Sequence, residues 1–429
     1  MTTIIVLGLL FCLLAIGTPV GFAMAFSGSV GLLMVGGPGT LFGILQTAPL
    51  STISSYELIT IPMFLLMADL VLLSGVADDL FKTASAWVGR IPGGLGMATA
   101  LAGAGFGAIC GTSTASAATL SSTSLPAMIR HGYEPKMAAG VVAISGTLAM
   151  LIPPSVALVI FGLLAEVNIG KLLIGGIIPA VLVTATIMGT IYFLVWQDPS
   201  RAPSVKAVPW RERFALLRQV GPMLILFSMV TGTIYLGIAT PTEASALGAM
   251  GALVLAVVRG KVTLPSLYKA LLSACHGTCM IVMILVGASI FGYFFTLTHV
   301  TQDLVAWIGS LPTSRWVIIT LILCGYIVLG SFMDQIAILV LTVPIVLPLI
   351  KTLGFDPIWF GVIKIVTAEV GMITPPVGLN CFIVARYANR PVSEVFHGTF
   401  PHFVAHLIAI AILVAFPGII LWLPSQMGN

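Results

Sequence analysis

The segment Met150-Leu-Ile-Pro-Pro-Ser155 reappears 222 residues later as Met372-Ile-Thr-Pro-Pro-Val377. A proline pair inside an apolar helix removes two N–H donors and frees carbonyl oxygens, so each copy predicts a broken helix. The same shift aligns six prolines, where about one is expected by chance at this composition. The aligned pairs are Pro19/Pro241, Pro126/Pro348, Pro135/Pro357, Pro153/Pro375, Pro154/Pro376 and Pro179/Pro401. The chain is therefore predicted to consist of two related halves.

Composition predicts that both halves lie in a membrane. Of the 429 residues, 59% are apolar and 7% are charged, whereas roughly a quarter of a soluble domain is charged. The mean hydropathy is +1.14. Since about 20 apolar residues cross a bilayer, we expect an all-α polytopic protein embedded in lipid. This composition excludes a soluble enzyme, a disordered chain and a nucleic-acid binder. Two repeated membrane halves are typical of secondary transporters.

Basic residues predict how the two halves are oriented. The halves are expected at residues 1–198 and 220–429, joined by a polar linker at 199–219 that carries several Arg residues and should be cytoplasmic. The apolar N-terminus lacks Lys and Arg, which indicates that it lies outside. The second half then runs inverted and the C-terminus also lies outside. Two parallel halves remain the alternative.

A count of the charges in this topology tests the orientation. Eleven basic residues fall inside: Lys82, Arg90, Arg130, Lys136, Arg201, Lys206, Arg211, Arg213, Arg218, Arg386 and Arg390. Six fall outside: Lys171, Arg259, Lys261, Lys269, Arg315 and Lys351. The bias has the sign that the positive-inside rule requires.

Each half is expected to follow one plan. Three helices lead to a short interfacial helix near Trp87 or Trp307. A re-entrant hairpin follows, at about 94–131 in the first half and 314–354 in the second. The helix broken by the proline pair comes next, at about 134–166 and 356–386, and a final helix closes each half.

The hairpin tips carry the polar chemistry. The first tip reads Gly111-Thr-Ser-Thr-Ala-Ser116, and its repeat mate reads Gly330-Ser-Phe-Met-Asp-Gln335. Glycine permits the turn, and hydroxyls with freed carbonyls supply the oxygen ligands that hard cations such as Na⁺ prefer. Helix packing by small residues is the alternative reading of the first tip. One polar tip and one break in each half favour a site between the repeats at the membrane midplane.

Ionisable residues in apolar segments are further candidates, because their burial is costly. Asp334 is the best charged ligand candidate. Lys364 and Glu369 are expected to form an ion pair, with each other or with Asp69. Glu243 is expected to cap the helix that starts near Pro241.

The cysteine and histidine residues do not predict a metal site. Cys275 and Cys279 are one turn apart with His276 between them, but no further metal ligand lies nearby in the sequence. We expect all six cysteines to be buried packing residues, and His276 and His299 to be packing or interfacial residues.

The motifs together resemble one family. The first tip, the Ile-Pro-Pro-Ser and Thr-Pro-Pro-Val-Gly breaks, and the run Gly237-Ile-Ala-Thr-Pro-Thr-Glu-Ala244 are similar to the large membrane subunit of TRAP (tripartite ATP-independent periplasmic) transporters. The resemblance covers essentially the whole chain. It implies an inverted-repeat, elevator-type ion-transporter fold in the bacterial inner membrane. The outer side, on which the charge pattern places both termini, is then the periplasm. The resemblance further implies Na⁺ coupling with two or more ions, a small four-helix membrane subunit and a periplasmic substrate-binding protein.

The resemblance also implies site residues and a substrate class. Na⁺ ligands are expected at Gly111, Thr112, Ser113, Pro153, Ser155, Met333, Asp334, Gly371, Thr374 and Gly378. Substrate contacts are expected at Thr112, Ser113, Ser116, Ser155 and Thr374. Family substrates are organic acids, and overall likeness favours the sialic-acid members, with a C4-dicarboxylate permease as an alternative. No organic cofactor is expected.

Other classes remain to be tested. A self-sufficient Na⁺/dicarboxylate or citrate symporter would work without a binding protein. An intramembrane enzyme is disfavoured, because the sequence has no Gly-x-Ser-x-Gly elbow and no His-Glu-x-x-His motif. An ATP-driven pump would need a phosphate-binding loop that this chain lacks, and paired broken helices favour alternating access over a channel.

Overall fold

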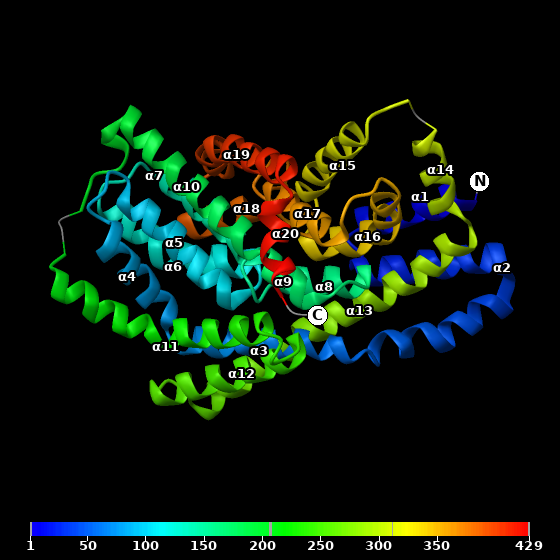
Figure 1. The fold of residues 1–429 in the computed structure, drawn as a ribbon, viewed down its shortest axis with the longest axis horizontal. Helices are drawn as coiled ribbons and strands as arrows, with labels where there is room; N and C mark the ends of the chain where they lie inside the picture. Colours follow the sequence, from blue (N-terminus) through cyan, green and yellow to red (C-terminus); the bar gives the residue numbers. More distant parts are fainter. Residues whose placement is uncertain (1, 206–207, 311, 428–429) are drawn as a thin grey trace.

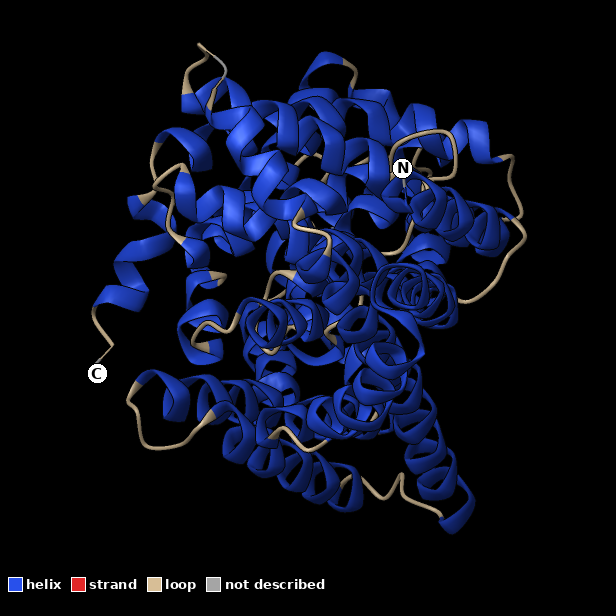
Figure 2. Ribbon diagram, turned by 90° about the vertical axis from the view of Figure 1, so that its right-hand side faces the viewer, coloured by secondary structure: helices blue, strands red, loops and turns tan. Residues whose placement is uncertain are grey.

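A computed structural model describes residues 2–205, 208–310 and 312–427, and within these ranges the chain is helical without strands (Figure 2). The first half contains α1 (Thr2–Ala15), α2 (Val20–Ile53), η1 (Tyr56–Ile59), α3 (Thr60–Leu73), α4 (Val76–Val88), α5 (Gly94–Cys110), α6 (Ser113–Arg130), α7 (Pro135–Thr147), η2 (Leu148–Met150), α8 (Val156–Ala165), α9 (Ile169–Gly175) and α10 (Ile177–Gln197), followed by η3 (Pro199–Arg201). The second half contains α11 (Trp210–Tyr235), α12 (Pro241–Val258), α13 (Leu264–Leu297), α14 (Val300–Gly309), α15 (Arg315–Gly330), α16 (Gln335–Thr352), α17 (Pro357–Gly371), α18 (Leu379–Ala388), α19 (Val392–Ala415) and α20 (Gly418–Ser425).

The protein crosses a membrane several times. Eight helical runs in the described ranges are long and apolar enough to span a bilayer. They cover Val20–Ile53, Tyr56–Leu73, Ile169–Gln197, Trp210–Tyr235, Pro241–Val258, Leu264–Leu297, Gln335–Thr352 and Val392–Ala415. The all-α polytopic fold class expected from composition is confirmed.

The sequence repeat reappears as a structural repeat. Helices α6 and α16 begin at residues 113 and 335 and end at 130 and 352, so both boundaries keep the shift of 222. Helices α7 and α17 begin at prolines with the same shift. A proline at the first helical position is pre-organised for the helix and needs no N–H partner there, so Pro135 and Pro357 start these helices.

The helices form two layers (Figure 1). The scaffold layer, as we call α2, α3, α11, α12 and α13, runs along one side of the molecule, and the hairpin layer, α5–α8 with α15–α19, lies beside it. The scaffold is formed by both halves together, because α2 of the first half packs on α13 of the second, and α3 packs on α12. The Thr60 and Thr242 hydroxyls hydrogen-bond at 2.8 Å across one pair. At the other pair, Gly21 lets the α2 backbone approach the α13 backbone at Met283 and Ile284.

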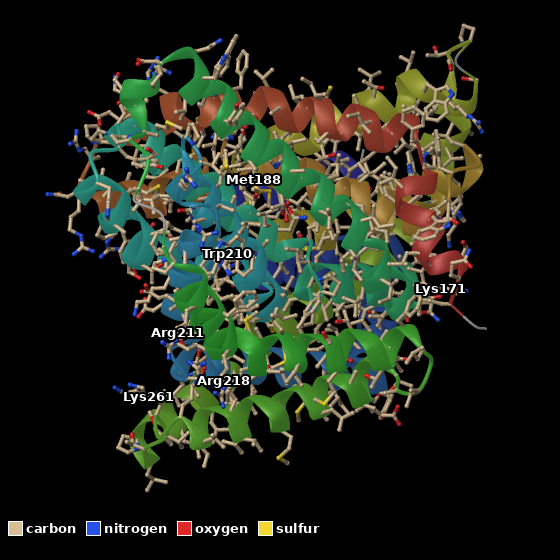
Figure 3. The ribbon with its side chains drawn as sticks, turned by 60° about the vertical axis from the view of Figure 1, so that its left-hand side comes forward. Lys171, Met188, Trp210, Arg211, Arg218 and Lys261 are labelled. Carbon is tan, nitrogen blue, oxygen red and sulfur yellow. The ribbon has the colours of Figure 1, made fainter. Side chains whose placement is uncertain are left out.

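The first turns of α11 lie beside the end of α12. Residues 210–219, which the sequence assigned to the linker, form the first turns of α11, and Lys206 lies outside the described residues. Arg259 at the end of α12 donates to the Gln219 carbonyl oxygen at 2.5 Å and pairs with Asp79 at 2.6 Å. Figure 3 shows Lys261 at the same end of the molecule as Arg211 and Arg218, with Lys171 at the opposite end.

The placement of Arg259, Lys261 and Lys269 on the outer side is therefore wrong, since Lys269 lies in the second turn of α13, which begins where α12 ends. Helices α11 and α12 run in opposite directions as consecutive spans, so the end of α12 returns to the side on which α11 begins. The charge count omitted this second crossing. With all three residues moved to the linker side, the bias becomes stronger in the expected direction.

Two smaller expectations have different outcomes. Glu243 does cap α12: its carboxylate accepts the Thr240 N–H at 2.8 Å, and the Thr240 hydroxyl accepts the Glu243 N–H at 3.3 Å.

The prediction that all six cysteines are buried packing residues is wrong, because only Cys110 and Cys381 are buried. The other four are exposed on helix surfaces: Cys12, Cys275, Cys279 and Cys324. In a membrane protein such surfaces face lipid or a partner, so an apolar sequence context does not imply burial within the chain.

Helices α7 and α19 approach too closely to admit a side chain between them. A Cβ atom at Gly140 would overlap the backbone of Gly398. We predict that Gly140→Ala destabilises the protein by about 1–3 kcal/mol, since overpacking forces the backbones apart. The measurement is the thermal midpoint of the detergent-purified protein. The control is Gly189→Ala on α10, where nothing lies near the added methyl group and no loss is expected. Equal midpoints for the two variants would contradict the close approach.

Candidate substrate and cation site at the hairpin tips

The first hairpin tip lies on the first helix break. Helix α5 ends at Gly111, whose φ of +62° is left-handed, and extended Thr112 leads directly into α6. A Cβ at Gly111 would sit against the Pro154 carbonyl oxygen, so glycine allows the tip to touch the broken segment. The segment between η2 and α8 is almost wholly buried. Ser155 closes it, because its hydroxyl donates to the Met150 carbonyl oxygen and accepts the Leu158 N–H at 3.2 Å.

The second tip repeats this arrangement with different chemistry. The Ser331 carbonyl oxygen accepts the N–H groups of Val377 and Gly378 at 3.1 and 3.3 Å, which fastens the tip to the second break. Asp334 caps α16, since one carboxylate oxygen accepts the Ile336 N–H at 3.0 Å. Gly330 and Gly371 let α15 and α17 come into backbone contact there.

The two tip-and-break units meet at the centre of the hairpin layer. Helix α6 of the first hairpin packs on α18, which follows the second break. In the mirrored arrangement, α16 of the second hairpin packs on α8, which follows the first break. The Ser113 hydroxyl donates to the Met372 sulfur at 3.6 Å, a direct contact between the first tip and the second break. Residues from both halves therefore form one site region.

The expected site residues divide into two groups. The structure brings together the buried residues Gly111, Ser113, Ser116, Pro153 and Ser155 around the first tip, with Thr112 partly exposed beside them. It brings together Met333, Asp334, Gly371, Thr374 and Gly378 around the second. The two second-break prolines and Val377 are exposed, in contrast to the buried first break. The two regions thus differ in access although their sequences correspond.

Four of the buried side chains whose polar atoms lack a partner lie at these chain reversals. Ser116 lies in the first turn of α6, Gln335 in the first turn of α16, Glu369 in the last turn of α17 and Asn380 in the first turn of α18. All four are 0% exposed, and within the part of the chain that the structure describes the Ser116 hydroxyl, both amides and the Glu369 carboxylate oxygens find no hydrogen-bond partner. Unpaired buried polar groups are costly, so these four side chains are candidates for contacts with a ligand.

The expected ion pair of Lys364 or Glu369 is not formed. Among the described residues, none of the four ion pairs includes Lys364, Glu369 or Asp69. The Lys364 Nζ instead lies 5.0 Å from the centre of the Tyr326 ring. Five residues of α-helix rotate the side chain by about 140°, so the two groups point to different sides of α17.

Three buried polar residues escaped the sequence reasoning. Asn380 follows the second break directly, and its N–H donates to the Met372 carbonyl oxygen at 3.1 Å. His402 and His406 lie on α19, are 0% exposed, and are linked by a 3.2 Å contact from His406 Nδ1 to the His402 carbonyl oxygen. Proximity to Gly378 could have singled out Asn380. Nothing local distinguishes the two histidines, because their burial comes from packing against distant helices.

A large cavity separates the layers on the side opposite the linker. Its volume is about 820 Å³, and its lining includes Tyr56, Glu57, Asn168, Thr240 and Thr242. Thr240 follows the far end of α11 from Trp210, so the cavity opens away from the basic end of the scaffold. The layers therefore part on this side.

Paired hairpins, paired broken helices and an intervening cavity define a secondary transporter. The comparison with family models agrees: residues 7–419 match the DctM component of the tripartite ATP-independent periplasmic transporters. The chain belongs to this family of large permeases and is a transport protein rather than an enzyme. Large permeases of this family work in the inner membrane with a periplasmic binding protein and a small membrane subunit.

Relatives across the full chain carry different substrate names. The C4-dicarboxylate TRAP transporter large permease DctM of Pseudomonas aeruginosa is 34% identical, covering 88% of each chain. The sialic acid TRAP transporter large permease SiaM of Vibrio cholerae is 30% identical, covering 98% of this chain and 96% of the relative. The crystal structure of the YdaH transporter of Alcanivorax borkumensis matches with a TM-score of 0.68 at 16% identity, covering 90% of each chain, and supports the fold alone.

Ser155 holds the first break closed, so its removal is informative. We predict that Ser155→Ala lowers the free energy of unfolding by about 1 kcal/mol, since α8 loses its cap, with a further loss because the buried Met150 carbonyl oxygen loses a donor. The measurement is thermal unfolding in Na⁺-free buffer. The matched control is Ser122→Ala, an exposed serine that bonds only to the Thr119 carbonyl oxygen of its own helix. A loss no larger than the control's would refute the capping role.

Proposed function

We propose that this chain is the large subunit of a Na⁺-coupled transporter that takes up an organic acid delivered by a periplasmic binding protein. The observation that supports this most is the meeting of two hairpin tips with two helix breaks, lined by buried polar groups that lack partners. In a membrane, non-helical backbone survives only where protein covers it or where it lines a site.

The polarity of the helix ends supports binding of both charges. Helices α5, α15 and α17 end at the tips and at the second break, so their carbonyl ends favour cations. Helices α6, α8, α16 and α18 begin there, so their N–H ends favour a carboxylate. We assign Na⁺ ligands to the two sets around Gly111–Ser155 and Met333–Gly378, with hydroxyl and amide oxygens completing them. The acid then lies against Ser113, Ser116 and Thr374.

Transport follows from movement of the hairpin layer against the scaffold layer. The 820 Å³ cavity gives access from one side in the present conformation. With the linker cytoplasmic and both termini periplasmic, this is the periplasmic side, where the binding protein releases its acid. Two Na⁺ with one monoanionic acid move one net positive charge inward, which gains about 2.3 kcal/mol per 100 mV. The small four-helix subunit completes the scaffold, and a stand-alone symporter is disfavoured by the family.

Two acids are the leading substrates. Overall likeness of the sequence favours sialic acid, and the relative named for sialic acid covers nearly the whole chain. The relative named for C4-dicarboxylates has the higher identity, 34% against 30%. We therefore propose a carboxylate substrate and keep both classes as candidates.

Na⁺ binding is tested first on the purified complex with its small subunit. We predict a saturable rise in thermal stability with Na⁺ that K⁺ and choline do not reproduce, worth about 2.7 kcal/mol at 100 times the dissociation constant. Ser113→Ala and Asp334→Asn should shift the titration to higher Na⁺ by about tenfold each, while Ser122→Ala leaves it unchanged. Uptake into proteoliposomes that is indifferent to Na⁺ would rule out the coupling.

Substrate class is tested by uptake with the cognate binding protein. We predict that Na⁺-dependent uptake of one radiolabelled acid, succinate or sialic acid, exceeds that of the other by at least tenfold. Omission of the binding protein should abolish uptake of both. Equal uptake without the binding protein would favour the stand-alone symporter instead.

A further inference from the structure

The second helix break borders a cavity that the function described so far does not use. Its volume is about 350 Å³, and it lies between the break and the first turns of α19. Pro375 of the break and three aromatic rings of α19, Phe396, Phe400 and Phe403, form much of its wall. Cavities of about 300–1,000 Å³ that are lined mainly by apolar and aromatic side chains commonly bind small molecules.

The polar groups in the cavity wall already have partners. The Thr374 hydroxyl donates to the Val370 carbonyl oxygen at 2.6 Å, and the Thr399 hydroxyl donates to the Phe396 carbonyl oxygen at 3.0 Å. His397 Nδ1 lies 2.6 Å from a carbonyl oxygen of its own helix. None of the described residues that line the cavity is Lys or Arg. A carboxylate would lose its water there without gaining a charged partner, so the cavity suits an apolar ligand.

The corresponding place at the first break is filled by the protein itself. Apolar side chains of α3 and α11, among them Met67 and Phe227, line the contact with Pro154, and a space of only about 10 Å³ remains there. Pro376 is the repeat mate of Pro154, and it is exposed together with Pro375. The second break therefore lacks the apolar cover that its repeat mate has.

The uncovered side of the second break faces lipid. Helix α19 lies on the side of the hairpin layer away from the scaffold layer (Figures 1 and 3). Its exposed side chains Phe400, Val404 and Ile408 are four residues apart, so they form one apolar stripe along this membrane span. Phe400 belongs to this stripe and to the cavity wall. The cavity is therefore continuous with the lipid-facing surface.

The cavity lies in the half of the bilayer on the linker side, which is the cytoplasmic half in the proposed orientation. Helix α19 begins at that side, because its Gly398 meets the Lys136 carbonyl oxygen at the start of α7. Next to Lys136, the Glu134 N–H donates to the Arg201 carbonyl oxygen at 2.7 Å. From its start to Phe403, α19 rises by about 16 Å, which is close to half of a hydrocarbon core about 30 Å thick. A lipid tail of this leaflet can therefore reach the whole cavity.

We propose that the cavity binds an acyl chain of a phospholipid from the linker-side leaflet, which covers the second break as α3 and α11 cover the first. The chain packs against Phe396, whose ring lies so close to Gly378 that a Cβ atom there would overlap it. The ring thus rests on the backbone of the break. In a membrane such binding is driven by close packing, because a void leaves the atoms around it without contacts. This inference does not depend on which ion or acid is transported.

The test locates lipid tails by photolabelling. The complex with the small subunit is reconstituted in vesicles of phosphatidylethanolamine and phosphatidylglycerol, with a small fraction of phosphatidylcholine that carries a diazirine at the end of one acyl chain. After irradiation, peptide mass spectrometry reads the labelled positions. We expect residues 373–375 to be labelled at least fivefold more than their repeat mates, residues 151–153, because only the second break has an open cavity. Equal labelling of the two segments would overturn the proposal.

A matched pair of variants separates a bound chain from passing lipid. Phe403→Gln places an amide in the cavity wall and should lower the labelling of residues 373–375 at least threefold. Leu407→Gln places the same amide one turn further along α19, at a residue that is also partly exposed but does not line the cavity, and should leave the labelling unchanged. The same labelling in both variants would show only general exposure to lipid, and the acyl-chain site would be wrong.

A measurement on the unmodified protein tests the other occupant and covers the case in which Phe403→Gln does not fold. The second break and α19 both belong to the hairpin layer, so the cavity stays intact when that layer moves. Saturating Na⁺ with succinate or sialic acid should therefore change the labelling of residues 373–375 by less than twofold. If the acid abolished this labelling, the cavity would belong to the transported acid and the proposal would fail.

Discussion

Backbone hydrogen bonding in a bilayer is the constraint on which this structure depends. Lipid offers no partners, so every interruption of a helix must be satisfied by protein or used for binding. The chain contains two hairpin reversals and two proline breaks, and each break is covered by a tip of its own half. Ser155 and the Ser331 carbonyl oxygen satisfy groups that the prolines expose. Four of the buried side chains left without partners lie at these reversals: Ser116, Gln335, Glu369 and Asn380.

The pseudo-symmetry explains why the site region is shared between the halves. Each half gives the other a packing partner: α2 with α13 and α3 with α12 in the scaffold, α6 with α18 and α16 with α8 in the hairpin layer. Neither half can bury its interrupted helices alone. The two halves nevertheless differ in the surroundings of corresponding residues, since the first break is buried and the second is exposed. Different access to similar sites is what alternating access requires of a repeat.

The local sequence is sufficient to predict the helices and their breaks, but it is insufficient to predict the tertiary contacts between them. The proline pairs, the glycines at the tips and Pro135 with Pro357 act within a few residues, and the helices begin where these residues predict. The Lys364–Glu369 pair failed because proximity in sequence was taken for proximity on a helix face. Arg259 was misplaced because its side depends on the crossings before it, and His402 with His406 were missed because only tertiary packing buries them. The site roles of the tip residues rest on motif resemblance and the geometry, and remain proposals.

Coupling between the ions follows from where the helix ends lie. In the proposed function, carbonyl ends of some helices and N–H ends of others meet at one place, so a cation and a carboxylate bind within reach of each other. Each lowers the cost of burying the other, because opposite charges attract strongly where water is scarce. That attraction favours the loaded state but does not by itself prevent a partly loaded one from moving.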